Sequence, residues 1–527
     1  MNNELNGQQE IILSPKKSGG KKAAVIAAIA VVAVGAAAGI CIGVPSVNNS
    51  LKMALSSPED YYSGVIRKEI SESADKTAEN YAAYCEKFNS DSAVKGTLTI
   101  TPGPALLEEL LLEERGVSAD NMKIGCDYVM RTSGGQTEGA ADMSLSFADK
   151  PLLDISTVVS GDSQYMSIPT ISEKWLSMTS EDIEKALGTS IDTADKMKLL
   201  DGTVLTKERL GSMADRYMDI YLAHAGNVTL NKNTELTSAS GVTSKYTEAV
   251  VSIDEASAKA MAEEFTAAIK ADSDIKDIWL AAGASEDDYN DLMSELTPGE
   301  SFSPYEIRTY IAADGSITGI KLTTDSGELS EILYTSGDNF SLELLLASDG
   351  DNISFTADGT VKNDVANGSG KLVVSEKTEY YEDEYNISFT FDDLDVKKLE
   401  NGDLIGNISV DFSLDDTDSF SMSLIGKEDH AEATASISTD GENLLTVFAS
   451  SEDTDFTAIE IPQGTTINIL DQEALMDYIK NSDYSKLKSN ISALSDIIGQ
   501  DAVDYANELI DSLTVDYDYD NAYDVMY

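Results

Sequence analysis

The most constraining feature of this sequence is a long run of short strands and tight turns between Tyr305 and Ile461. Asp-Gly and Asn-Gly dipeptides punctuate the run, and two-residue hairpins favour these pairs because both central residues need a positive φ. A meander of about ten antiparallel strands is therefore predicted. The dipeptides are Asp314-Gly315, Asp349-Gly350, Asp358-Gly359, Asn367-Gly368, Asn401-Gly402 and Asp440-Gly441.

A second strand region lies earlier in the chain, where apolar residues occupy every other position. Such alternation predicts an antiparallel sheet with one buried face. Between its first two strands, Pro104–Arg115 has the composition of a short apolar helix that Gly116 would end. The alternating segments are Val94–Ile100, Ile124–Met130, Met143–Phe147 and Leu153–Val159.

Helical spacing appears on both sides of these strand regions. Ser57 can cap a helix that begins at Pro58, and apolar residues recur at three- and four-residue steps as far as Phe88. Further helices are predicted at Leu210–Tyr221, after Asp254 as an N-cap, and over Gln472–Leu513.

Residues Ala23 to Val44 form a run of 22 residues without a charged side chain. As an α-helix, this run would span about 33 Å, which is enough for the hydrocarbon core of a bilayer. The first basic residue after it is Lys52, whereas four lysines lie just before it. The positive-inside rule then places the N-terminus in the cytoplasm and the rest of the chain outside. The four lysines are Lys16, Lys17, Lys21 and Lys22.

A cleaved signal peptide is the alternative for this segment, because Ala36, Ala38 and Gly39 would offer small residues at a cleavage site. The apolar part of a signal peptide is usually about 7–15 residues long. The greater length of this run favours an uncleaved anchor.

Together, these patterns predict an α+β fold class: large antiparallel β-meander sheets packed with helices, preceded by one N-terminal transmembrane helix. The predicted division is a disordered cytoplasmic tail at 1–22, a transmembrane helix at 23–44, a juxtamembrane helix at 45–92, an α+β first half of the ectodomain at 93–300, an antiparallel β second half at 301–470, C-terminal helices at 471–513 and an acidic tail at 514–527.

The charge balance restricts the partners. The formal net charge is −56, from 37 basic and 93 acidic residues. Nucleic-acid binding needs a basic surface to displace counterions, so it is excluded as a function class. A strongly acidic protein attracts cations instead. Of the three cysteines, Cys41 lies in the apolar run, while Cys85 and Cys126 would form either one disulfide or two thiols.

No motif for catalysis or cofactor binding is complete. The only histidines, His224 and His430, are far apart, and no G-x-S-x-G occurs. Gly368–Lys371 resembles a phosphate loop, but Leu372 replaces the hydroxyl residue that would hold magnesium. Ser485–Lys488 fits S-x-x-K, yet no K-T-G follows. We therefore assign no catalytic and no cofactor-binding residue, and expect His224 at a helix end and His430 in solvent.

A calcium site is the one metal site that the sequence offers. Asp516, Asp518 and Asp520 alternate like the first ligands of an EF-hand loop, but Asn521 replaces its turn glycine. Asp415, Asp416 and Asp418 form another acidic group. The alternative in both places is an ordinary solvated acidic turn.

The chain also resembles a known group of proteins. Tyr165-Met166-Ser167-Ile168-Pro169, with Trp175 soon after, follows the first strands, and Ile459-Glu460-Ile461-Pro462 precedes the terminal helices. In this order of elements the chain resembles uncharacterised membrane-anchored surface proteins of Gram-positive anaerobes, which carry a domain of unknown function. The layout is also similar to the lipoprotein-carrier (LolA- and LppX-like) superfamily. That resemblance implies a curved sheet whose concave face holds an acyl chain, and it transfers no functional residue.

The expected function is that of a membrane-anchored extracytoplasmic protein without enzymatic activity, which either binds a ligand such as a lipid or serves as an interaction module of the cell envelope. Its expected partners are the bilayer, through residues 23–44, and a hydrophobic ligand such as a lipid or a component of the cell envelope. The alternatives are a cell-wall or glycan hydrolase using paired carboxylates, and a structural spacer or adhesin. Two Ile-Pro elements, at Ile168-Pro169 and Ile461-Pro462, leave open whether the two halves arose by duplication.

Overall fold

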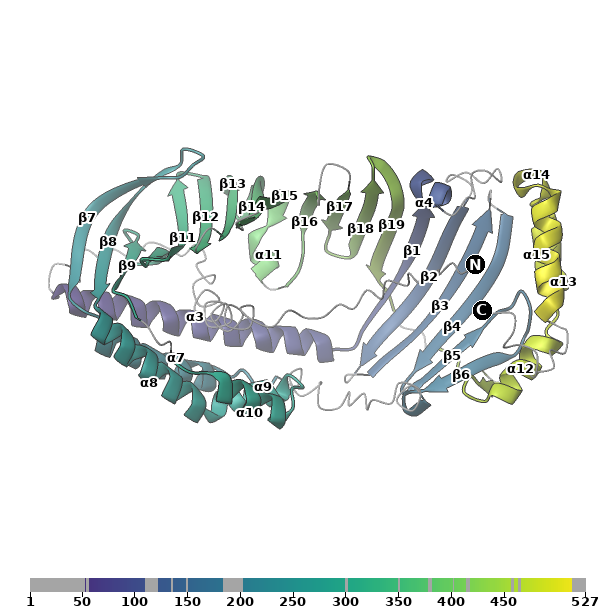
Figure 1. Cartoon of the computed structure of the whole chain (residues 1–527), viewed down its shortest axis with the longest axis horizontal. Helices are drawn as coiled ribbons and strands as arrows, with labels where there is room; N and C mark the ends of the chain where they lie inside the picture. The colour runs from purple at the N-terminus through teal and green to yellow at the C-terminus, as the bar shows by residue number, and fades with distance from the viewer. Residues whose placement is uncertain are drawn as a thin grey trace, which may run out of the picture.

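The computed structural model describes residues 53, 56–109, 122–133, 136–147, 150–182, 202–298, 302–348, 351–377, 382–400, 402–413, 418–455, 459–462 and 466–513. These residues form a single sheet of 20 strands that bends around a long helix (Figure 1).

The strands follow one another across the sheet in the order β7 to β19, then β1 to β6, then β20. Every neighbouring pair is antiparallel except β6 and β20, which are parallel. The first group of strands is β1 (Ser92–Pro102), β2 (Met122–Ser133), β3 (Gln136–Phe147), β4 (Lys150–Ser160), β5 (Ser163–Ser167), β6 (Trp175–Thr179), β7 (Val228–Thr237) and β8 (Thr243–Ile253). The remaining strands are β9 (Tyr305–Ile311), β10 (Ile317–Thr323), β11 (Gly327–Ser336), β12 (Asn339–Ser348), β13 (Asp351–Lys362), β14 (Val365–Lys377), β15 (Glu382–Asp395), β16 (Gly406–Ser413), β17 (Ser419–Gly426), β18 (His430–Thr439), β19 (Glu442–Asp453) and β20 (Thr466–Asn468).

Helices α3 and α7–α10 lie below the sheet, α12–α15 lie at one end of it, and the short α4 and α11 lie beside its strands (Figure 1). The longest is α3, which begins directly after Ser57, and the backbone N–H of Asp60 donates to the Ser57 hydroxyl. The described helices are α3 (Pro58–Asn89), α4 (Pro104–Glu109), α7 (Lys207–His224), α8 (Glu255–Ala271), α9 (Ser273–Ala281), α10 (Glu286–Glu295), α11 (Val396–Glu400), α12 (Gln472–Asn481), α13 (Ser485–Ser492), α14 (Ser495–Ile498) and α15 (Gln500–Leu513).

The predicted fold class is wrong in two respects. It placed the strands in separate sheets, but β1 pairs with β19, with Leu98 opposite Ala449, and so joins the early strands to the late meander. The period of a strand specifies its faces and not its partner, so a pairing between such distant segments has no local sequence signal.

The second correction concerns the transmembrane helix that the predicted fold class included. Within the described residues, every helix is too short or too polar to cross a membrane. The segment predicted to do so, 23–44, and the tail at 1–22 lie outside the described residues. The orientation derived from that segment, with the N-terminus in the cytoplasm and the remainder outside, stays a prediction.

The meander predicted after Tyr305 is present, and it comprises the consecutive antiparallel strands β9 to β19. Asp314-Gly315 and Asp440-Gly441 lie in its hairpin turns, as predicted. Gly402 lies between α11 and β16. Residues 349, 350 and 401 lie outside the described residues.

Two of the predicted turns are wrong, because Gly359 lies inside β13 and Gly368 inside β14. These glycines are paired with each other, and a Cβ at Gly368 would be 2.2 Å from the carbonyl oxygen of Asp358 and 2.6 Å from the ring of Phe391. Glycine at these two positions permits the close approach of the paired strands and of the Phe391 ring, and it does not mark a turn. The actual turn residues are Asn363 and Asp364, with φ values of 52° and 66°.

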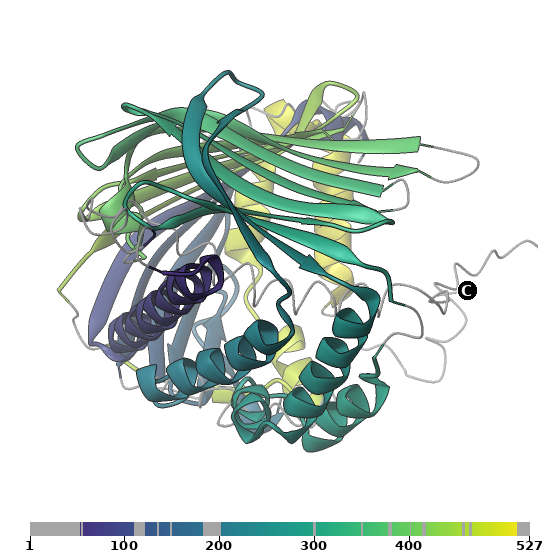
Figure 2. The ribbon, with the colours of Figure 1, turned by 90° about the vertical axis from the view of Figure 1, so that its left-hand side faces the viewer.

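The main core lies where α3, α7 and α8 pack against the strands at one end of the sheet (Figure 2). The three-and-four spacing of α3 places four apolar side chains on the face that enters this core. The fully or nearly buried members from the two sides are Tyr61, Tyr62, Val65, Ile66, Met218, Ala258 and Met261 from the helices, and Val228, Ala249, Val251, Ile253, Ile311 and Ile317 from the strands.

Candidate functional site

From β12 to β1 the sheet has two chemically opposite faces, whereas at β8–β11 the second face is also apolar, because Tyr246, Tyr310, Ile332 and Tyr334 form a buried cluster there. Residues opposite each other on paired strands point to the same side, and successive residues alternate, so the registers define rows of side chains across the sheet. One row from β11 to β4 is apolar throughout: Leu333, Leu342, Ala357, Gly370, Phe389, Val410, Met422, Ala435, Val447, Ile100, Ile124, Leu145 and Leu153. The side on which this row lies is called the apolar face.

The neighbouring row points to the other side and is polar throughout. This side is called the polar face. From β12 to β1, its row consists of Glu343, Thr356, Lys371, Ser388, Asp411, Ser421, Ser436, Thr446 and Thr101. Such a contrast is typical of a sheet with one face in water and the other turned away from it.

The apolar face is turned toward α3. The Tyr62 hydroxyl of α3 is 3.3 Å from the hydroxyl of Thr309 on β9 and 2.8 Å from that of Tyr221 on α7. Thr309 lies on the apolar face, since it pairs with Ile320 of β10. Tyr62 is 1% exposed, and burial raises the pKa of its hydroxyl. The hydroxyls satisfy one another inside the core, so they hold the helix against this end of the sheet.

Part of the apolar face between β12 and β15 is covered by a cluster of phenylalanine rings and by α11. Rings of Phe340, Phe355, Phe389 and Phe391 stack across β12, β13 and β15, with centroids 5.3–6.4 Å apart. Val396 of α11 and Leu404 in the segment after it pack against the cluster that contains Phe391. Gly368 and Gly370 of β14 leave the room that the rings of Phe391 and Phe389 fill.

Beyond these covers, large side chains of the apolar face are exposed to solvent. Leu346 is 45%, Ile353 42%, Tyr385 37%, Ile437 42% and Met130 43% exposed. By register they belong to the face that packs on α3 at β9, and the ribbon shows the sheet bending around that helix (Figures 1 and 2). Scattered apolar residues are normal on a surface, but these share one face of one sheet, which is typical of a binding surface.

One ionisable residue lies on the apolar face within β11. Glu331 is opposite Ile320 on one side and Leu344 on the other. Its Oε2 atom is buried and has no hydrogen-bond partner among the described residues. Burial raises the pKa of this carboxyl above its ordinary value. A buried carboxyl oxygen without a donor is costly, so its presence needs an explanation.

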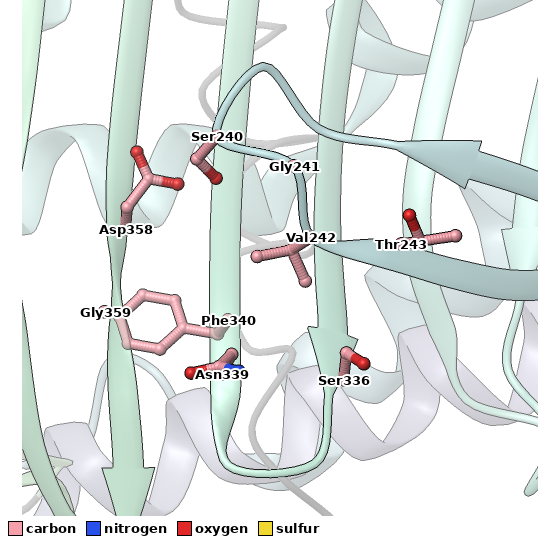
Figure 3. A pocket seen from close by; sticks show the side chains of 9 residues that line it. All are labelled: Ser240, Gly241, Val242, Thr243, Ser336, Asn339, Phe340, Asp358 and Gly359. Atoms are coloured by element: carbon pink, nitrogen blue, oxygen red, sulfur yellow. The ribbon is translucent and has the colours of Figure 1, made fainter.

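The polar face carries a pocket of about 450 Å³ under the hairpin that joins β7 to β8 (Figure 3). The hairpin is held there by the backbone N–H of Ala239, which donates to Glu343 Oε1 at 2.6 Å. Most of the lining side chains bear hydroxyl, amide or carboxylate groups, so the pocket is chemically unlike the apolar face. Its lining is Ser240, Gly241, Val242, Thr243, Ser336, Asn339, Phe340, Asp358 and Gly359.

The two histidines lie on different elements, and each is paired with a carboxylate. His224 ends α7 and its Nε2 is 2.9 Å from Glu264, as expected for a residue at a helix end. His430 begins β18 and lies 2.8 Å from Glu432. Both described cysteines, Cys85 and Cys126, are thiols rather than a disulfide, and Cys85 is buried.

The two incomplete motifs have structural roles. Gly368–Lys371 lies inside β14, where it forms part of the ladder to β13 and β15. In the S-x-x-K segment, Lys486 is 3.5 Å from Asp154 and Lys488 pairs with Asp511. Both lysines are therefore paired with carboxylates.

The calcium candidates Asp516, Asp518 and Asp520 lie outside the described residues, as do Asp415 and Asp416. Asp418, the described member of the second group, accepts a hydrogen bond from Thr439. Over the described ranges, acidic, histidine and cysteine side chains do not gather in threes as a metal site requires.

Comparison with known proteins leaves the family open. No protein-family model and no curated protein matches the chain. Among solved structures, it is similar at a TM-score of 0.12 to a loop-deletion mutant of OmpT, an outer membrane protein of Vibrio cholerae, with 9% identity over 69% of this chain and 98% of that one. A structure described under asymmetric conductivity of engineered proteins gives 0.11, with 10% identity over 69% and 99%.

Proposed function

We propose that this protein binds an elongated apolar ligand, such as a lipid chain, on the apolar face of its sheet, and that its role is binding or carriage without covalent chemistry. The observation that supports this proposal most directly is that large apolar side chains of several strands are exposed on the same face of the sheet. Those side chains are Leu346, Ile353, Tyr385, Ile437 and Met130, each between 37% and 45% exposed.

The arrangement of these residues favours a chain over a compact ligand. Leu346, Ile353, Val374 and Tyr385 form one row across β12, β13, β14 and β15. Three strand spacings of about 4.8 Å give this row a length of about 14 Å. A ligand that covered about 200 Å² of apolar surface would gain about 5 kcal/mol from burial. An alkyl chain laid along the row would obtain that contact without entering the packed core.

Native mass spectrometry of the purified full-length chain, with extraction of whatever accompanies it, tests the proposal. We expect a bound molecule with an alkyl chain, or saturable binding of an added alkyl probe by a protein purified empty. A protein that is empty and also fails to bind alkyl probes would contradict the proposal.

A pair of variants connects such binding to the apolar face. Ile353→Lys places a charge on that face, and Ser388→Lys places the same charge at an exposed position of the polar face. Because a lysine at an exposed position can extend its ammonium group into water, both variants are expected to fold. We expect probe binding to weaken about tenfold or more in Ile353→Lys and to stay unchanged in Ser388→Lys.

A further inference from the structure

Glu331 is surrounded by apolar side chains on its face of the sheet. Across the sheet, its row contains no other ionisable side chain among its described members. That row runs from β9 to β1 through Thr309, Ile320, Glu331, Leu344, Phe355, Leu372, Ile387, Phe412, Phe420, Ile437, Leu445 and Pro102. Along its own strand, the next residues on the same face are Leu329 and Leu333.

The position of Glu331 divides the apolar face. On one side of it, Thr309 is covered by Tyr62 of α3. On the other side, Leu346 and Ile353 are exposed to solvent. Glu331 on β11 therefore lies between the part of the face that packs on α3 and the part that is exposed on β12 and β13, which is where the polar end of a ligand lying on the exposed part would meet the protein.

The Glu331 carboxyl group has an oxygen that is available to accept a hydrogen bond. Its Oε2 is buried without a partner among the described residues, while the residue as a whole is only half-buried. Rotation about the terminal torsion of a glutamate exchanges its two oxygens at little cost. A ligand that approaches from the exposed side can therefore give a donor to the oxygen that now has none.

We propose that Glu331 binds the cationic, amine-bearing end of the ligand, whose chain then lies over β12 to β15. This inference rests on the proposed function. A cationic donor is favoured over a neutral one because hydrogen bonds between ionised groups are roughly twice as strong as neutral ones. The net charge of −56 also attracts cations and repels anions. An anionic head, such as that of a fatty acid, would bring a second carboxylate next to Glu331.

Three probes with the same chain and different heads test the inference: dodecylammonium, dodecanol and dodecanoate. Each is titrated into the full-length chain below the concentration at which it forms micelles or separates from solution, at physiological salt, where exposed charges are screened beyond about 8 Å. We expect dodecylammonium to bind at least about tenfold tighter than dodecanol, and dodecanoate to bind weakest.

The variant Glu331→Gln removes the charge and keeps the shape, and should abolish the preference for the amine. Glu331→Leu should do the same and bind dodecanol at least as tightly as the original protein. Asp411→Asn is the matched control, because it removes one carboxylate from the polar face. It should leave the preference intact.

The same titrations distinguish a wrong role for Glu331 from a wrong proposed function. If the probes bind but the preference for the amine persists in Glu331→Gln, or is absent in the original protein, the role of Glu331 is overturned and the apolar binding face stands. If none of the three probes binds, the proposed function itself fails.

Discussion

The hydroxyl of Tyr62 on α3 lies 3.3 Å from the hydroxyl of Thr309 on β9, and this contact ties the long helix to the apolar face of the sheet. Tyr62 also contacts Tyr221 of α7 at 2.8 Å, so one side chain joins two helices and a strand. Thr309 lies two strands from Glu331 in the same row.

Removing this hydroxyl should destabilise the protein. Tyr62→Phe leaves the buried hydroxyls of Tyr221 and Thr309 with fewer partners, and we expect a loss of about 1–2 kcal/mol in the free energy of unfolding. Denaturant titration measures it. Tyr505→Phe, at a tyrosine that is 58% exposed, is the control and should change nothing. Equal midpoints for the original protein and Tyr62→Phe would show that the contact does not hold α3.

The ion pair between Glu248 and Arg308 should contribute far more than a surface pair. Arg308 Nη1 is 2.7 Å from Glu248 Oε1, and Glu248 is 6% exposed. Glu248→Ala leaves the guanidinium with Glu306 alone, 2.5 Å from its Nη2, and we expect a loss of about 1.5–3 kcal/mol. Breaking the exposed pair of Lys245 and Glu235 by Lys245→Ala should cost less than about 1 kcal/mol. Similar losses in the two variants would contradict this ranking.

Two glycines that look alike in sequence should respond oppositely to alanine. In Gly368→Ala, the new Cβ would lie 2.2 Å from the backbone oxygen of Asp358, so β13 and β14 must separate. We expect a loss of about 2 kcal/mol or more in unfolding free energy. Gly64 of α3 has open space around it, and Gly64→Ala should stabilise by about 0.5–1 kcal/mol. Thermal melts distinguish the two; a tolerated Gly368→Ala would refute the paired register.

Stability should depend on pH through Glu331 and Asp254 with opposite signs. Burial raises the pKa of Glu331, so the folded state holds its proton more tightly than the unfolded state. The contribution of Glu331 to the free energy of unfolding is then favourable at acidic pH and is lost as pH rises. Glu331→Gln should therefore raise the unfolding midpoint at neutral pH and make little difference below the ordinary carboxyl pKa of about 4.3.

The N-cap residue Asp254 provides the opposite case. The backbone N–H of Ser257 donates to its carboxylate and lowers the pKa of that group. This contribution is present at neutral pH and is lost as pH falls. Asp254→Ala should therefore lower the midpoint at neutral pH and converge with the original protein in acid. Parallel pH profiles for the two variants would contradict the assignment.

Much of the local structure could be predicted from the sequence, but not the assembly of the sheet. The alternation at Val94–Ile100 identifies β1, and the three- and four-residue steps after Pro58 identify α3. The pairing of β1 with β19 could not be predicted, because alternation is the same for every possible partner. The prediction of a turn at Asp358-Gly359 was wrong for a related reason. The sequence alone does not distinguish a glycine that a turn requires from one that the close approach of a neighbouring strand requires.

The sequence analysis did not identify the residues of the candidate site, although the sequence contains a signal for Glu331. The resemblance to lipoprotein carriers implied a concave face for an acyl chain, and assigned it no residue. In β11, the alternate residues Leu329, Glu331 and Leu333 place a charge in an otherwise apolar series. That interruption can be read from the sequence, but its meaning depends on the neighbours Ile320 and Leu344, which only the registers supply.

The most direct test of the apolar binding face is a calorimetric titration of the full-length chain with dodecanol at several temperatures, repeated with the double variant Ile353→Lys/Tyr385→Lys. We expect saturable binding with a negative change in heat capacity, because apolar surface leaves water, and a loss of that binding in the double variant. Heats no larger than those of dilution, or undiminished binding in the double variant, would contradict the claim that this face holds the ligand.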